Sequence, residues 1–134
     1  MSDTADLLAN VPLLSGLDRK QLEKLANDFS ERTFAPGAVI VREGDDHGVG
    51  FFVVAEGEGD VTVGGRQVDT IGPGSYFGEV ALISDRVRTA TVTARTDMRC
   101  LVMTLWDFRA FVRGDADVAW KLLEHVGGML HNRA

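Results

Sequence analysis

Residues 61–68 of this chain are Val61-Thr62-Val63-Gly64-Gly65-Arg66-Gln67-Val68. Valine and threonine favour β-strands, and two consecutive glycines supply the positive φ angles that both central residues of a type I′ turn need. The stretch therefore predicts a two-residue β-hairpin, and its register pairs Val61 with Val68 on one face. A hairpin of this kind indicates an antiparallel sheet.

The glycines divide the chain into three zones. Eleven of the fifteen lie between Gly37 and Gly78, and the patterns at both ends are helical. In the middle zone, β-branched or aromatic runs bounded by Gly, Pro and Asp predict strands at 38–41, 51–54, 90–94 and 99–103. Short strands at this spacing are typical of an antiparallel sandwich or barrel. We therefore expect an α+β fold, a β jelly roll of the double-stranded β-helix type flanked by N-terminal and C-terminal helices.

The length of 134 residues fits one domain, because a single core commonly organises about 100 to 200 residues. We expect N-terminal helices over about 1–32, the jelly roll over 33–103 and C-terminal helices over 104–134. Asp18 and Gln21 form a predicted capping box, with Leu17 and Leu22 as a hydrophobic staple. The following face is predicted to contain Leu22, Leu25 and Phe29.

Two further helices are predicted after the strands. Thr104 and Asp107 are spaced as a capping pair for a helix that ends near Arg113, and Asp115 opens the last helix. That helix has a broad apolar face, which contains Val118, Leu122 and Val126. Two glycines, Gly127 and Gly128, predict a kink or an early end, since each costs about 1 kcal/mol relative to alanine. We expect Trp106 and Trp120 to anchor the packing.

The composition excludes several classes of protein. A net charge of -6 argues against a surface that binds nucleic acid, because such surfaces cluster Lys and Arg. The N-terminus is acidic, and no apolar run approaches the roughly 18 residues of a membrane span, so we expect no membrane partner. One cysteine allows no intramolecular disulfide, so we expect a cytosolic location. The single cysteine, Cys100, lies in a predicted strand, which indicates a small core residue rather than a nucleophile.

The stretch from Gly72 to Val92 has the composition of an anion pocket. Gly78 allows a close approach of the backbone to a ligand, and residues 79–82 could form a helical turn whose free N–H groups face a phosphate. The guanidinium of Arg88 can hold two phosphate oxygens at once. The carboxylate of Glu79 suits a ribose hydroxyl or can orient Arg88, and Thr89 adds a hydroxyl donor.

These residues resemble a known family. Phe77-Gly78-Glu79-Val80-Ala81-Leu82-Ile83, followed after four residues by Arg88-Thr89-Ala90-Thr91-Val92, resembles the phosphate-binding cassette of cyclic-nucleotide-binding domains. The family includes catabolite activator proteins and the regulatory subunits of cyclic-nucleotide-dependent kinases. The resemblance implies a cyclic AMP or cyclic GMP sensor that uses no cofactor and catalyses no reaction.

The resemblance also implies roles for single residues. Glu79 would bind the ribose 2′-hydroxyl, and Arg88 the cyclic phosphate. Further contacts to the ligand would come from Gly78, Val80, Ala81 and Thr89. Val63 and Val68 would pack against the base. A C-terminal helix would close over the base, with His125, Leu130 or His131 as its contact residues.

Several alternatives stay open. Glu79 and Arg88 could form only a structural ion pair, and the fold could serve as a protein interaction module that answers to no nucleotide. Cyclic AMP is our expected ligand, although Thr89 does not decide between the two, because a hydroxyl residue after the arginine occurs with either nucleotide in the family. The expected partners are an unknown effector protein or domain and a second copy bound through the C-terminal helix. Metal binding by His47, His125 and His131 is not expected, because their spacing does not suit a shared ion.

Overall fold

The computed structural model describes residues 3–44, 50–78 and 90–133. They form two compact units. The β unit contains Phe29–Leu105, and the helical unit combines Met1–Asp28 with Trp106–Ala134.

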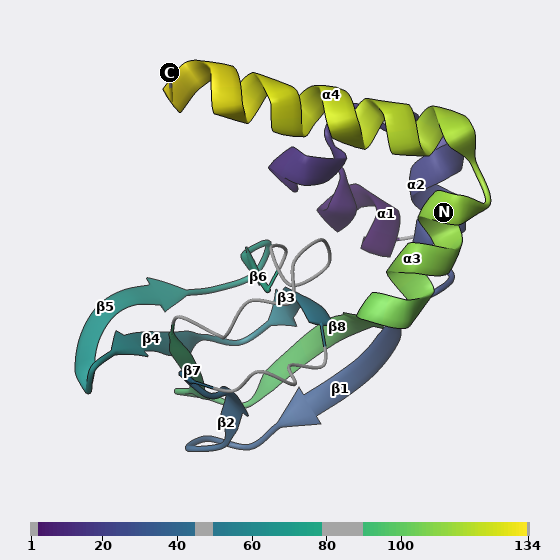
Figure 1. Cartoon of the computed structure of the whole chain (residues 1–134). Helices are drawn as coiled ribbons and strands as arrows, with labels where there is room; N and C mark the ends of the chain where they lie inside the picture. Colours follow the sequence, from purple (N-terminus) through teal and green to yellow (C-terminus); the bar gives the residue numbers. More distant parts are fainter. Residues whose placement is uncertain (1–2, 45–49, 79–89, 134) are drawn as a thin grey trace. The chain divides into compact units, whose positions relative to one another are not determined.

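The β unit consists of two four-stranded antiparallel sheets (Figure 1). Sheet A contains, in spatial order, β1 (Ser30–Phe34), β8 (Met98–Thr104), β3 (Gly50–Glu56) and β6 (Tyr76–Phe77). Sheet B contains β2 (Val39–Val41), β7 (Thr91–Ala94), β4 (Gly59–Val63) and β5 (Arg66–Ile71). Strands distant in sequence are neighbours in both sheets, as in a jelly roll. The predicted fold class is confirmed.

The core of the β unit is apolar and draws on both sheets. Its buried residues are Phe52, Val54, Ala94, Met98, Cys100 and Val102. Side chains alternate along β3, so Phe52 and Val54 share a face while Phe51 and Val53 share the other. The second pair is also buried, and the Phe51 ring meets the Phe29 ring edge-on with centroids 6.0 Å apart. β3 is therefore buried on both faces, and with β8 it is one of the two inner strands of sheet A.

The β4–β5 hairpin has the predicted turn. Gly64 and Gly65 have φ angles of 60° and 81°, which suit a type I′ turn. Val63 pairs with Arg66 directly across this turn. Glycine is needed here because a side chain is strained at such angles.

The predicted pairing of Val61 with Val68 is wrong, because Val61 pairs with Asp69. Val68 is the extra residue of a β-bulge, which shifts the register of β5 by one position. The bulge places Ile71 opposite Gly59, on the face that packs against the core. Without it Ile71 would lie on the other face, since a slip of one residue inverts every following side chain.

The helical unit contains four α-helices and one 3-10 turn among the described residues. They are α1 (Asp3–Leu8), η1 (Pro12–Leu14), α2 (Arg19–Ala26), α3 (Leu105–Arg113) and α4 (Ala116–Arg133). The predicted capping box is confirmed: the Asp18 carboxylate accepts from Gln21 N at 2.8 Å, and the Gln21 side chain accepts from Asp18 N at 3.0 Å. Both staple residues, Leu17 and Leu22, are buried.

The end of α2 differs from the prediction. The helix stops at Ala26, so Phe29 does not share a helix face with Leu22 and Leu25. Phe29 belongs to the β unit, where its ring packs on Phe51. The helical spacing of Leu22, Leu25 and Phe29 predicted one continuous face. Phe29 instead packs on Phe51, which is distant in sequence.

The predicted early end of α4 is also wrong. The helix continues through Gly127 and Gly128 to Arg133. Both glycines are exposed, and a Cβ built on either meets no atom within 4 Å. The propensity cost of about 1 kcal/mol for each glycine weakens a helix without breaking it, because its hydrogen bonds use only backbone atoms.

The two tryptophans are not the packing anchors we expected. Trp106 on α3 is 71% exposed and Trp120 on α4 is 62% exposed. The buried residues of these helices include Phe108 and Phe111 on α3 and Val118 and Leu122 on α4. Among the helices of residues 3–26 and 105–133, none combines the length and the apolar composition that crossing a membrane requires.

Candidate functional site

The described part of the predicted cassette begins at β6. Phe77 pairs with Phe52 of β3, and their rings stack with centroids 4.8 Å apart and planes 6° apart. Tyr76 pairs with Val53, and its ring lies 6.3 Å from that of Phe51. Two aromatic contacts therefore fix β6, an edge strand of only two residues, to its neighbour β3.

A glycine-rich turn leads the chain into β6. Gly74 has a φ of 88°, as the third residue of a type II turn requires, and Pro73 precedes it. The turn closes with a hydrogen bond of 2.9 Å from Ser75 N to the carbonyl of Gly72. It is joined to β3 because Gly74 N donates to the Val54 carbonyl and Val54 N donates to the Ser75 carbonyl, each at 2.8 Å.

Gly78 follows β6 directly and has a φ of 84°, in the region where glycine is favoured. A side chain here would strain the backbone at the point where the chain leaves sheet A. This conformation is a second reason for glycine at position 78, besides the close approach of a ligand. Its contact with a ligand remains a prediction.

Five predicted ligand residues lie outside the described residues. They are Glu79, Val80, Ala81, Arg88 and Thr89. The suggested structural ion pair between Glu79 and Arg88 lies outside them too, as does His47. Their roles therefore stay predictions.

Val63 and Val68, the two predicted base contacts, differ in their surroundings. Val61 pairs with Val92, which is 3% exposed, so both lie on the core face of sheet B. Val63 lies two positions further along β4 on that same face, yet it is 42% exposed. Val68 is 56% exposed at the bulge of β5. Val63 thus extends the apolar face of sheet B beyond its packed part, which is what contact with a base requires.

The opposite face of sheet B is polar. The Asp60 carboxylate forms an ion pair with Arg95, which also donates to the Thr70 hydroxyl at 3.3 Å. The Gln67 amide donates to Asp60 and to Thr70, each at 3.1 Å. The polar side chains therefore bond to one another on this face, and the face that contains Val61 and Val63 is the apolar one.

Glu43 contacts the hairpin turn next to Val63, which the sequence did not indicate. Its carboxylate accepts a hydrogen bond of 2.9 Å from Gly64 N in the hairpin turn. Its own N–H donates to the Thr91 hydroxyl at 2.9 Å, at the start of β7. No local sequence signal connects Glu43 to Gly64 and Thr91, because these residues lie 21 and 48 positions away.

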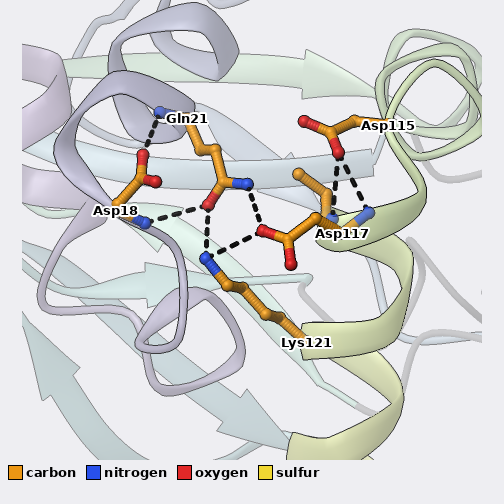
Figure 2. Close-up of polar contacts among 6 residues, drawn as sticks. Asp18, Gln21, Asp115, Asp117 and Lys121 are labelled. Carbon is orange, nitrogen blue, oxygen red and sulfur yellow. Dashed lines mark hydrogen bonds and ion pairs between the residues drawn. The ribbon is translucent and has the colours of Figure 1, made fainter.

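A polar cluster joins α2 and α4 in the helical unit (Figure 2). The Gln21 amide nitrogen donates to Asp117 at 2.9 Å, while its oxygen accepts from Lys121 at 2.9 Å. Lys121 also forms an ion pair with Asp117 at 3.0 Å. The hydrogen bond from Gln21 first, and that from Lys121 next, lower the pKa of Asp117. Asp115 caps α4, as predicted, because its carboxylate accepts from Asp117 N at 3.0 Å.

The remaining residues considered in the sequence are Cys100, the histidines and Leu130. Cys100 is fully buried, and burial raises its pKa to about 11, which confirms a core residue. His125 is half-buried on α4, and the side chains of Leu130 and His131 are not described. Within residues 3–44, 50–78 and 90–128, no three His, Cys, Asp or Glu side chains are grouped to hold a metal ion.

The comparisons with known proteins agree on one family. A model described as "Cyclic nucleotide-binding domain" matches residues 31–115. The cAMP-dependent protein kinase regulatory subunit of Schizosaccharomyces pombe is 40% identical over 94 residues, which cover 69% of this chain and 23% of that protein. The chain therefore corresponds to only a part of this relative.

Solved structures give the same answer. The N-terminal domain of a transcriptional regulator from Streptomyces coelicolor A3(2) matches with a TM-score of 0.88 and 31% identity, over 96% of this chain and 94% of that one. The regulatory domain of Toxoplasma gondii PKA, crystallised with cAMP, matches with a TM-score of 0.70 and 28% identity, over 90% of this chain and 48% of that one. With the family model, the identities and the jelly roll in agreement, the chain belongs to the cyclic nucleotide-binding domain family.

Proposed function

We propose that this chain is a sensor domain that binds cyclic AMP in preference to cyclic GMP and catalyses no reaction on it. The family match over residues 31–115, which include the whole cassette, is the observation that carries the proposal. The name of the Schizosaccharomyces pombe relative and the cAMP bound to the Toxoplasma gondii domain support cyclic AMP as the ligand. The location proposed for it is the cytosol.

The proposed site combines a charged end and an apolar end. Arg88 binds the cyclic phosphate through its planar guanidinium, with backbone donors from Gly78 and Ala81 and the hydroxyl of Thr89 beside it. Glu79 accepts from the ribose 2′-hydroxyl. These assignments follow the cassette pattern. The φ of 84° at Gly78 supports the match, because this conformation favours glycine at that position of the cassette.

The base lies against the apolar end in this proposal. Val63 contributes the exposed continuation of the core face of sheet B, and Val68 lies at the neighbouring bulge. Covering the two valines with a base would remove apolar area from water, at roughly 25 cal/mol per Å². No bound cofactor or metal is needed, since recognition uses hydrogen bonds and apolar contact alone.

Regulation requires that the nucleotide favour one conformation over another. A ligand that binds both equally shifts nothing, and a tenfold coupling takes about 1.4 kcal/mol. We propose that α4 changes its contacts when the nucleotide binds and that an effector protein or domain detects the change. Of the three predicted contact residues for the base, His125 on α4 is the one whose side chain the structure describes.

Calorimetric titration of the chain with cyclic AMP and cyclic GMP tests this function. We expect binding of both, with cyclic AMP tighter. Linear 5′-AMP is the matched control, because it keeps the base and the ribose but lacks the cyclic phosphate. At 100 times its Kd, cyclic AMP should add about 2.7 kcal/mol to the free energy of unfolding. The absence of heat and of any thermal shift with both cyclic nucleotides would refute the sensor function.

A second candidate is an interaction module, and the exposed face of α4 favours it. Ala116, Trp120, Leu123 and Gly127 follow a 4-3-4 spacing and are all exposed, with Trp120 and Leu123 each at 62%. This spacing forms a seam along a helix that a second copy of the chain can cover. Sedimentation of the chain and of Leu123→Glu tests it, since a dimer would dissociate in the variant.

A further inference from the structure

Glu43 connects three segments of the β unit that are far apart in sequence. It follows β2, and its carboxylate accepts from Gly64 N in the turn between β4 and β5. Its backbone N–H donates to the hydroxyl of Thr91, the first residue of β7. Both distances are 2.9 Å. One residue thus fixes the hairpin turn to the strand that the chain enters after residues 79–89.

The hairpin turn needs such a connection. Gly64 and Gly65 both have positive φ angles, and a Cβ built on either finds no atom within 4 Å. The turn therefore extends into open space, and two adjacent glycines have more conformational freedom than any other pair of residues. A hydrogen bond from a charged acceptor restricts that freedom at the residue next to Val63.

We infer that Glu43 is a positioning residue for nucleotide binding: it holds the Val63 end of β4 in place as the wall against which the base packs. This inference rests on the proposed function and adds to it a residue outside the cassette. Glu43 itself touches no ligand in this scheme. It acts through the Gly64 backbone and so through the neighbouring Val63.

The chemistry of the side chain defines the variants. Glu43→Gln keeps an oxygen of the same reach, which still accepts from Gly64 N but carries no charge. Glu43→Ala removes the acceptor entirely. Glu58→Ala is the matched control, because Glu58 is also an exposed glutamate and lies in the turn at the opposite end of β4. The three variants separate the loss of the hydrogen bond from the loss of a negative charge.

The test measures the Kd for cyclic AMP by calorimetry in the wild type and the three variants. Glu43→Ala should bind about 3- to 10-fold more weakly, the factor that corresponds to one net hydrogen bond. Glu43→Gln and Glu58→Ala should stay within about twofold of the wild type. Without nucleotide, the NMR signal of the Gly64 amide proton should move in Glu43→Ala far more than in Glu43→Gln. Urea unfolding should leave the midpoints of Glu43→Gln and Glu58→Ala unchanged, and should lower that of Glu43→Ala by no more than the loss of one net hydrogen bond.

The outcomes distinguish the positioning role from the sensor function. If the wild type binds neither cyclic AMP nor cyclic GMP, the sensor function fails and the positioning role fails with it. If the wild type binds and Glu43→Ala binds equally well, only the positioning role is overturned. Equal losses in Glu43→Ala and Glu58→Ala, or an equal loss in Glu43→Gln, would also overturn it, because charge and not the hydrogen bond would then matter.

Discussion

Gln21 and Asp117 are 96 positions apart in the chain, yet the Gln21 amide donates to the Asp117 carboxylate at 2.9 Å. The same Gln21 side chain closes the capping box of α2 and accepts from Lys121. One amide group therefore serves both the start of α2 and the first turns of α4. Because its side chain bonds to Asp18, Asp117 and Lys121, Gln21 is the residue on which the polar cluster of the helical unit depends.

Replacing Gln21 by alanine should destabilise the protein by about 1 kcal/mol, the typical net contribution of a hydrogen bond, because the bonds of its side chain are lost while Asp18 still caps the backbone N–H of residue 21. Urea unfolding of the variant measures this loss. The substitution should also raise the pKa of Asp117 towards its ordinary value, because its largest lowering cause is removed. An NMR titration of the Asp117 carboxyl follows that change, and an unchanged pKa would contradict the assigned hydrogen bond.

The same carboxyl predicts a dependence of stability on acid pH. A carboxyl whose pKa is lowered by folding stabilises the folded state above its unfolded pKa of about 3.9, and this contribution is lost as the pH falls through the lower folded value. Asp117→Asn removes the titrating group and should flatten the loss of stability below pH 4. A variant with the same acid dependence as the wild type would show that Asp117 contributes nothing to it.

Cys100 should be inert towards thiol reagents in the folded protein. It is fully buried, and its pKa of about 11 leaves little thiolate at neutral pH. Folding raises this pKa above that of the unfolded chain, so the associated stability is complete below the unfolded pKa and declines as the pH rises towards 11. Reaction with a colorimetric thiol reagent should require urea. Rapid modification without denaturant would contradict the burial.

Gly127 provides a test of the continuous α4. Because the helix is unbroken there and a Cβ meets no atom within 4 Å, Gly127→Ala should stabilise the protein by about 0.5 to 1 kcal/mol through helix propensity. Thermal unfolding followed by circular dichroism measures the gain. A destabilised variant would show that the helix does end or bend at this glycine.

Two signals that are local in sequence predicted their own structure. Asp18 and Gln21 are three residues apart, and their capping box formed as expected. The Gly64-Gly65 pair likewise predicted its own turn, because the φ angles of two residues decide the turn type. Runs of β-branched and aromatic residues between turn residues also predicted strands, and β3 and β8 formed where two such runs lie.

Features that depend on distant partners could not be predicted. The bulge at Val68 follows from the need to bring Ile71 to the core, which only the folded sheet reveals. Phe29 lies outside α2, and its ring packs on that of Phe51, a contact that the local helix pattern does not reveal. The contacts of Glu43 with Gly64 and Thr91 join residues 21 and 48 positions apart, and no local pattern around Glu43 predicts them.

The most direct measurement of the central claim is the affinity of Arg88→Ala for cyclic AMP. We expect calorimetry to show tight binding in the wild type and no measurable binding in this variant, with an unchanged urea midpoint. Arg32→Ala, which removes an exposed arginine from β1, should bind normally. Undiminished affinity of Arg88→Ala for cyclic AMP would contradict the account, because the guanidinium would then not hold the cyclic phosphate.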